Sequence, residues 1–143
     1  MELLTREFPV RVLARNPSHL PEHIREQVEV FRGSTDNVAV LRRALEGAEA
    51  LFWCVPSAPV HDVNVRAHYE RFALAGYQAI RDVGTGRVVT ISAAGSAFGG
   101  SAGRTSGLHA MEDILDRSGT SIKHLRCGDK WFEPVPVCTM RAA

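Results

Sequence analysis

Runs of residues that favour β-strands alternate with helical periodicity along most of this 143-residue chain. Strand-like apolar runs stand at 10–14, 28–31, 50–55, 88–91 and 122–125. Between them, apolar residues spaced three and four apart predict helices over about 37–46, 64–83 and 108–117, and a short polar helix is predicted over 19–26. Strands that alternate with helices build a parallel sheet, and right-handed connections wind such a sheet in both directions. The sequence therefore predicts an α/β fold: a doubly wound parallel sheet with helices on both faces.

Capping residues mark the ends of several of these elements. Thr35 or Asp36 is expected to cap the helix that follows the second strand, because short polar side chains accept hydrogen bonds from the first free amides of a helix. Gly47 is expected to end that helix in the left-handed conformation. From Cys127 onward the sequence is predicted to be irregular.

Composition excludes several classes of protein. The formal net charge is only +1, so no nucleic-acid partner is expected. The chain has 3 cysteines and none forms a CxxC pair, which favours reduced thiols. Pro21 separates His19 from His23, so a helical pair of metal ligands is not expected either. No apolar run is long enough for a signal peptide or a membrane span, and a soluble, cytoplasmic protein is expected.

Ligands of doubly wound sheets bind at the carboxyl ends of the strands, so the loops that follow the strands are the candidate binding sites. A GxGxxG turn between a strand and a helix is not found in the sequence. Gly84 and Gly86 lead into a strand and are interpreted as an ordinary turn. Gly95 and Gly100 have the spacing of a phosphate-binding loop, but Lys-Ser/Thr does not follow them. The glycine-rich stretch 95–107 is interpreted as a mobile loop, which is either a lid over the substrate or an ordinary surface loop.

Three polar residues near predicted strand ends are candidates for chemistry. Arg15 follows the first strand, where a guanidinium suits the 2′-phosphate of NADP and a carboxylate would suit NAD; the alternative is a solvated arginine. Ser92 could bind a substrate carbonyl or the nicotinamide ribose, or be structural. His109 could act as an acid or base near neutral pH.

The tyrosine–lysine pair of redox enzymes with this kind of sheet is not found. Such a pair needs Tyr-x-x-x-Lys on the helix after the strand that carries the serine. Tyr69 and Tyr77 both precede that strand, and Arg81 follows Tyr77 at the fourth position. Both tyrosines are expected to be packing residues.

Several segments in a fixed order carry a family resemblance: 10–17, 30–33, 41–52, 88–93 and 112–119, followed by Leu125-Arg126. Their order and spacing resemble the NmrA-like branch of the atypical short-chain dehydrogenase/reductases, which are NAD(P)-binding Rossmann proteins. The resemblance covers about 2–133.

The resemblance implies a dinucleotide site with NADP favoured over NAD. It places Arg15 and Asn16 at the 2′-phosphate and Ser34-Thr35 beside the adenine, although the family usually has aspartate where Ser34 stands. Further residues would line the rest of the cofactor: Val55-Pro56 under the ribose and pyrophosphate, and Ser92-Ala93 near the nicotinamide.

The substrate side of the site is also implied by the resemblance. The family often has lysine or histidine four residues before the glutamate that matches Glu112, whereas His109 is three before it. Arg126, Trp131 and Phe132 resemble the floor of the substrate pocket.

Two parts of the family pattern are expected to be missing. The glycine-rich turn and the first, central strand would precede Met1, which makes 1–133 an incomplete Rossmann-like domain and 134–143 an irregular tail. Loss of a central strand removes core side chains and exposes two strand edges. The chain is therefore expected to be marginally stable or prone to aggregate unless the two strands beside the gap pair directly.

The resemblance implies an NADP-linked oxidoreductase, or a remnant of one, that acts on a small carbonyl or quinone. The alternative is a non-catalytic module that senses dinucleotides, with a homo-oligomer or partner complex covering the open sheet edges. A third interpretation is a truncated product without function.

Overall fold

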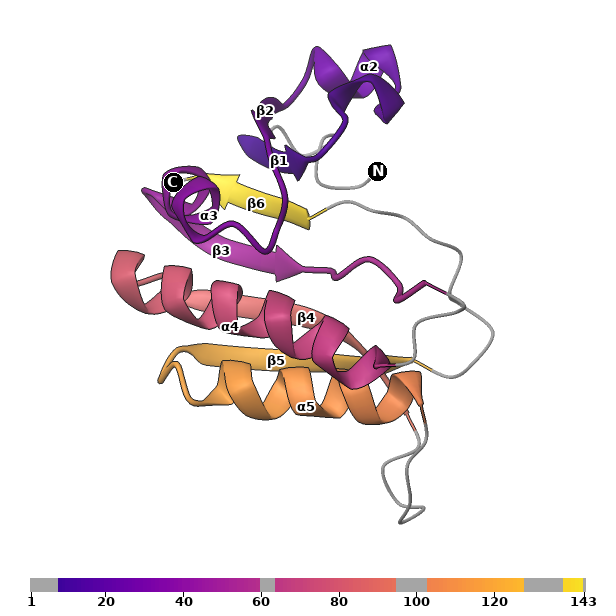
Figure 1. Ribbon diagram of the computed structural model, residues 1–143. Helices are drawn as coiled ribbons and strands as arrows, with labels where there is room; N and C mark the ends of the chain where they lie inside the picture. The colour runs from indigo at the N-terminus through magenta and orange to yellow at the C-terminus, as the bar shows by residue number, and fades with distance from the viewer. Residues whose placement is uncertain (1–7, 60–63, 95–102, 128–137, 143) are drawn as a thin grey trace.

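The computed structural model describes residues 8–59, 64–94 and 103–127 and the backbone of 138–142, which form an α/β fold. Figure 1 shows a single sheet with helices stacked against it. Its strand order is β2-β1-β6-β3-β4-β5. The strands are β1 (Val10–Ala14), β2 (Glu29–Arg32), β3 (Ala48–Trp53), β4 (Arg87–Ala93), β5 (Ser121–Cys127) and β6 (Cys138–Ala142). The predicted Rossmann-like fold class is confirmed.

Three longer helices and two short ones connect the strands. They are η1 (Pro17–His19), α2 (Glu22–Arg25), α3 (Val38–Leu45), α4 (Val65–Val83) and α5 (Arg104–Asp116). Strand pairs β1–β2, β3–β4 and β4–β5 are parallel, as the strand–helix alternation predicts. The carboxyl ends of these strands therefore lie along one edge of the sheet.

Strand β6 corrects the prediction of an irregular tail. It runs antiparallel between β1 and β3, with Cys138 opposite Leu13 and Thr139 opposite Phe52. In Figure 1 it is the yellow strand in the middle of the sheet. Without a strand there, β1 and β3 would each present a row of unpaired backbone N–H and C=O groups, and β6 supplies the missing partners. The two strands beside the gap thus pair with β6 and not with each other.

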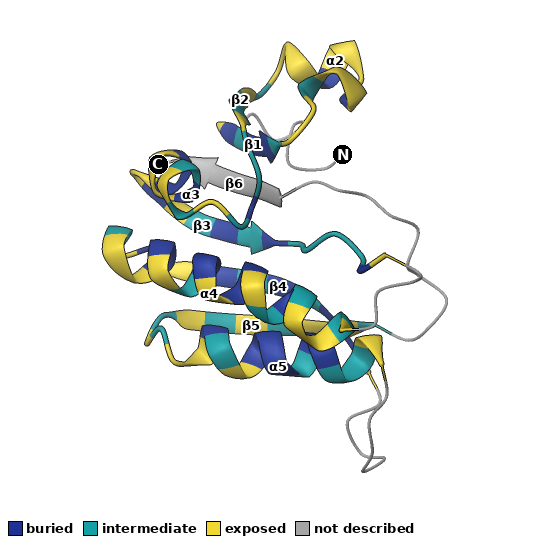
Figure 2. Ribbon diagram, viewed as in Figure 1, coloured by how far each residue is buried: buried dark blue, intermediate teal, exposed yellow. Residues whose placement is uncertain are grey.

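The main core lies between the sheet and the helices α3, α4 and α5, which Figure 1 shows in front of the sheet. Apolar side chains from both layers are fully buried there, among them Leu41, Leu51, Trp53, Ile80 and Met111. Figure 2 shows the buried positions of α4 and α5 as a stripe that alternates with exposed ones. This is the amphipathic pattern from which the helices were predicted.

A smaller cluster covers the opposite face of β1. Val10 and Val12 pack there against Leu20, which follows η1, while Leu13, the residue after Val12, belongs to the main core. Successive side chains of a strand point to opposite faces, so the short helices and α3 lie on different sides of β1. The helices on both faces of the sheet agree with the prediction. Leu125 of β5 remains 44% exposed.

Asparagine side chains cap three of the described helices, η1, α3 and α4. Asn37 caps α3, because its Oδ1 accepts from the amides of Ala39 at 3.1 Å and Val40 at 3.2 Å. The prediction that Thr35 or Asp36 caps this helix was wrong, since the helix starts one residue later than those caps require. Gly47 does follow the helix with φ of 71°.

Candidate functional site

A pocket lies at the carboxyl edge of the sheet. It has a volume of about 550 Å³ and is walled by the end of β1, the segment after β3 and the first half of α4. We call it the edge pocket, and its lining includes Arg15, Pro56, Ser57, His68, Arg71 and Phe72. Clefts at this edge, where the strand order reverses, are the ligand sites of doubly wound sheets.

Arg15 is the cation that the end of β1 contributes to the edge pocket. Its side chain is exposed and makes no hydrogen bond or ion pair with any residue that the structure describes. A guanidinium carries five N–H donors in a planar fork that matches phosphate or carboxylate oxygens. Arg15 is therefore available for an anionic ligand.

Asn16 is engaged within its own turn. Its Oδ1 accepts from the Ser18 amide at 3.3 Å and from the Ser18 hydroxyl at 2.7 Å, and its Nδ2 lies 3.0 Å from His19 Nε2. These contacts cap η1 and make the turn that presents Arg15. Contact between Asn16 and a phosphate stays a prediction.

Helix α4 supplies the second wall of the pocket. Asn64 caps the helix by accepting from the Ala67 amide at 3.0 Å, and His68 Nε2 lies 2.9 Å from the carbonyl oxygen of Pro56. Since a carbonyl only accepts, Nε2 of His68 carries the proton. This hydrogen bond fixes the segment after β3 against α4.

Arg71, one turn further along α4, brings a second guanidinium to the edge pocket. Its Nε lies 3.3 Å from Oδ2 of Asp36, in the loop after β2, and its Cζ lies 5.2 Å from the ring centroid of Phe72. The Arg71 side chain is 62% exposed. Sequence reasoning missed His68 and Arg71, although Asn64, His68 and Arg71 have the spacing of one helix face.

The other residues predicted for the adenosine end lie beside the pocket. Thr35 is buried, and the Ser34 carbonyl accepts from the Asn37 amide at 3.0 Å. Val55 packs against the main core, next to Pro56 in the pocket wall. Of the predicted cofactor contacts, the edge pocket brings together Arg15 and Pro56.

The residues predicted for the nicotinamide end gather at the end of β4. Ser92 is fully buried, and Ala93 is 6% exposed. His109 Nε2 lies 3.0 Å from the Ala93 carbonyl oxygen and donates to it, which pins α5 to the end of β4. The structure thus places Ser92, Ala93 and His109 together, but outside the described walls of the edge pocket. Of the glycine-rich stretch 95–107, residues 95–102 lie outside the described residues, and 104–107 form the first turn of α5.

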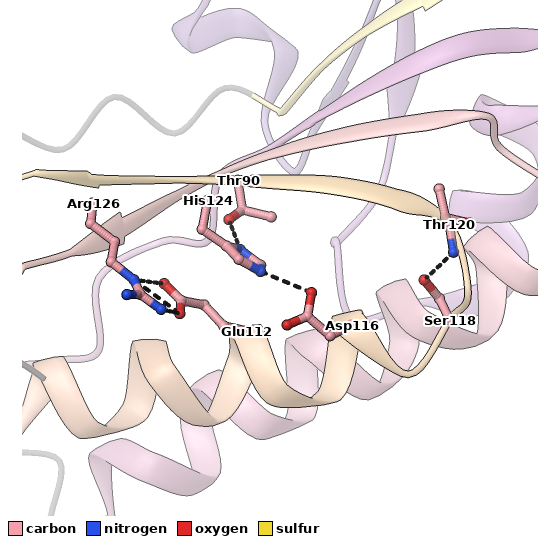
Figure 3. A network of polar contacts seen from close by, with 7 residues as sticks. All are labelled: Thr90, Glu112, Asp116, Ser118, Thr120, His124 and Arg126. Atoms are coloured by element: carbon pink, nitrogen blue, oxygen red, sulfur yellow. Dashed lines mark hydrogen bonds and ion pairs between the residues drawn. The ribbon is translucent and has the colours of Figure 1, made fainter.

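An ion pair between buried Glu112 of α5 and half-exposed Arg126 of β5 lies beside Ser92. Arg126 donates to both carboxylate oxygens of Glu112, at 3.1 and 3.2 Å from Nε and at 2.5 Å from Nη2 (Figure 3). Burial acts to raise the pKa of Glu112, but Arg126, the nearby Ser92 hydroxyl and the charge of His124 outweigh it and lower that pKa. The Ser92 hydroxyl faces Glu112 without a hydrogen bond of normal geometry.

Arg126 is thus bound to α5 through Glu112. Trp131 and Phe132, which were predicted to form a pocket floor with Arg126, lie outside the described residues.

A second polar chain in Figure 3 links the same elements. Thr90 Oγ1 lies 2.6 Å from His124 Nδ1, and His124 Nε2 lies 3.0 Å from Asp116 Oδ1. The carboxylate of Asp116 accepts from Nε2, and in the neutral imidazole Nδ1 then accepts from the hydroxyl of fully buried Thr90. This chain has the polarity of a hydroxyl–histidine–carboxylate triad, but its hydroxyl is sealed in the core. It therefore holds β5 to β4 and α5.

The described residues contain neither a candidate metal site nor a membrane-spanning helix. No group of three or more His, Cys, Asp or Glu side chains is placed to hold a metal ion there. Among the described helices, none combines the length and apolar character needed to cross a membrane.

Solved structures with the same fold include three that contain a nicotinamide dinucleotide. Bordetella bronchiseptica WbmH with NAD+ gives a TM-score of 0.73 at 18% identity, over 90% of this chain and 50% of that one. Citrobacter sp. triphenylmethane reductase with NADP(H) gives 0.65 at 20%, over 80% and 38%. The Escherichia coli NADPH-dependent quinone oxidoreductase QOR2 with NADPH gives 0.63 at 21%, over 87% and 42%. The chain spans half or less of the length of these proteins, and the likeness establishes the fold.

Sequence comparison identifies the family. The search of curated proteins found no match. The sequence pattern of the NAD(P)H-binding family matches residues 1–128, which is most of the chain. The match agrees with the resemblance to atypical short-chain dehydrogenase/reductases and with the Rossmann-like sheet. The chain belongs to the NAD(P)H-binding family.

Proposed function

We propose that the protein binds NADP in preference to NAD, and that it is an NADP-linked oxidoreductase or a remnant of one. The observation that carries this proposal is the exposed guanidinium of Arg15 at the end of β1, which lies in the edge pocket with Pro56 and makes no hydrogen bond or ion pair with the described residues. A 2′-phosphate is the group that distinguishes NADP from NAD, and a guanidinium binds phosphate through paired, charge-assisted hydrogen bonds. Such bonds correspond to a preference of roughly tenfold or more for NADP.

The described residues fit the phosphorylated adenosine end of the cofactor. Arg15 would meet the 2′-phosphate, Pro56 and its neighbour Val55 would lie under the ribose, and Ser34 and Thr35 would flank the adenine. When NADPH is bound, its nicotinamide supplies a hydride to a small carbonyl or quinone acceptor. Ser92 and Ala93 would lie near that ring, because both are at the end of β4.

A second candidate function is dinucleotide sensing without catalysis, and the geometry at the end of β4 favours it. Ser92 is fully buried, and Nε2 of His109 is occupied by the Ala93 carbonyl. A serine in this state does not reach a substrate oxygen, and His109 has only Nδ1 left for proton transfer. In this arrangement His109 acts as a positioning residue for the strand end.

Calorimetric titration with NADPH and NADH tests the binding proposal. We expect saturable binding of NADPH at micromolar concentration, weaker binding of NADH, and loss of binding in Arg15→Glu. Arg81→Glu is the matched control, because it makes the same charge reversal at the far end of α4, where Arg81 bonds to the Tyr77 hydroxyl. Binding that is unchanged in Arg15→Glu would refute the proposed role of Arg15.

Turnover separates the two candidate functions. Consumption of NADPH in the presence of benzoquinones or small aldehydes would support the oxidoreductase. Intact NADPH binding without consumption over such a panel would support the sensing module.

A further inference from the structure

We propose that the edge pocket is a half-site, which binds a nucleoside carrying a ribose phosphate between two arginine arms, Arg15 and Arg71. This inference rests on the proposed NADP binding and deepens it. It assigns a ligand role to Arg71, and it states that the phosphorylated adenosine end of NADP carries most of the affinity. A free fragment, adenosine 2′,5′-bisphosphate, should then bind nearly as tightly as the whole dinucleotide.

The charge of the pocket wall is the first support. Arg15 and Arg71 line the edge pocket together with His68, and no carboxylate belongs to its described lining. Asp36 lies just behind, at 3.3 Å from Nε of Arg71. That contact engages one N–H of the five in the Arg71 guanidinium, so most of its donors remain for a ligand. Two guanidiniums facing one cavity without a carboxylate in the wall favour a phosphate group.

The position of Arg71 is the second support, because the side chain is held from two sides. Asp36 fixes one side of the guanidinium, and the ring of buried Phe72 lies 5.2 Å beneath its Cζ. His68, one turn earlier, is hydrogen-bonded to Pro56 across the pocket wall. An arginine oriented in advance loses less conformational entropy when it binds an anion. Asp36 thus acts as a positioning residue for Arg71.

The antiparallel strand β6 at the centre of the sheet is the third support, because it explains why the adenosine end of the dinucleotide would contribute most of the affinity. In doubly wound sheets the pyrophosphate binds amides at the start of a helix that follows the central strand. Here the central strand is β6, which runs antiparallel, so its first residue, Cys138, and not its last lies at the carboxyl edge. No described helix follows β6 at that edge, and the Ala67 amide of α4 is already bonded to Asn64. Among the described residues, the pyrophosphate lacks its usual amides.

Calorimetric titrations with NADP, adenosine 2′,5′-bisphosphate, NAD and adenosine 5′-monophosphate test the half-site. We expect the bisphosphate to bind within about threefold of NADP, and NAD and the monophosphate to bind at least roughly tenfold more weakly. Arg71→Gln should weaken NADP and the bisphosphate by the same factor, roughly tenfold, whereas Arg81→Gln on the same helix should leave both unchanged.

Asp36→Asn separates a ligand role of Arg71 from a structural one. Asparagine still offers an oxygen that accepts from Nε of Arg71, but it takes a negative charge away from the phosphate, so binding of the bisphosphate should tighten about two- to fivefold. A structural ion pair predicts weaker binding instead. If Arg71→Gln does not fold, Arg71→Lys replaces it, because lysine keeps the charge, loses the fork and should still weaken binding.

The outcomes distinguish the two proposals. NADP that binds more than about thirtyfold tighter than the bisphosphate, or unchanged affinities in Arg71→Gln, would overturn the half-site and leave NADP binding intact. Absence of binding by every one of the four ligands at millimolar concentration would overturn both.

Discussion

Strand β6 should determine whether the two halves of the sheet hold together, and a proline in it tests this. Met140 of β6 lies opposite Arg11 of β1 and opposite Leu51 of β3, so it sits in the middle of both pairings. Met140→Pro removes a backbone N–H from a central strand, where proline is otherwise confined to edges and bulges. The substitution should detach β1–β2 from β3–β4–β5.

The size of the effect follows from the pairing. Proline removes one ladder hydrogen bond, which contributes about 1 kcal/mol, and leaves a buried acceptor without a partner, which costs about 1–3 kcal/mol. The sum of about 2–4 kcal/mol is a large part of the ~5–15 kcal/mol by which domains are stable. With a urea dependence of ~2 kcal/mol per molar, the unfolding midpoint should fall by about 1–2 M.

Urea unfolding and amide hydrogen exchange measure these effects. Met140→Ala is the matched control, since it truncates the same side chain and keeps the backbone N–H. In Met140→Pro we expect a lower midpoint than in Met140→Ala and faster exchange of amides in β1 and β3. Equal midpoints for the two variants, with β1 and β3 still protected, would show that β6 does not join the halves of the sheet.

Two further predictions concern the helices that cover the sheet. A Cβ at Gly76 would lie 2.8 Å from the Trp53 ring, so Gly76→Ala should lower the free energy of unfolding by about 1–3 kcal/mol, whereas Gly86→Ala, with a nearest contact of 3.6 Å, should not. Equal denaturation midpoints for these two variants would contradict the close packing of α4 on β3. The pKa of Glu112 is lowered from 4.5, so its pair with Arg126 should stabilise the fold above that pH and lose this effect as pH falls through the native pKa. Glu112→Gln should therefore destabilise the protein more at pH 7 than at pH ~3, and a difference that is the same at both pH values would refute the assignment.

Local patterns sufficed for most of the fold because they report burial directly. The first strand was predicted with the bounds that β1 has, and the helix over 64–83 corresponds to α4 with Asn64 as its cap. Periodic apolar residues identify such elements wherever one face is buried. The ends were less accurate: α5 begins at Arg104 and not near Leu108, because its first turn lacks the apolar spacing that marks the rest.

Strand β6 was missed because its reason for forming is not local. Residues 138–142 follow two prolines and are short, which favours an irregular segment. They form a strand because β1 and β3 leave a gap with unpaired backbone groups, a condition set by residues more than 80 positions away in β3. The sequence separation between Phe52 and Thr139 shows how non-local this pairing is.

Part of the candidate site was predictable and part was not. Arg15 was singled out because it directly follows a strand, and the edge pocket includes it. Arg71 was not singled out, because the sequence alone does not distinguish a helical arginine that lines a pocket from one that only contacts solvent. Its relation to the pocket depends on Asp36, which reaches it from another loop.

The ion pair between Arg126 of β5 and Glu112 of α5 also affects whether the protein associates with other chains in concentrated solution. β5 is the last strand on one side of the described sheet, and an unpaired strand edge is a template for another chain. Lys123 and Arg126 are exposed on this strand, and Glu112 holds Arg126 in a fixed position. A second chain that paired here would have to desolvate these charges, which edge strands use to prevent association. We therefore expect the ion pair that holds β5 to its helix to oppose aggregation through this edge as well.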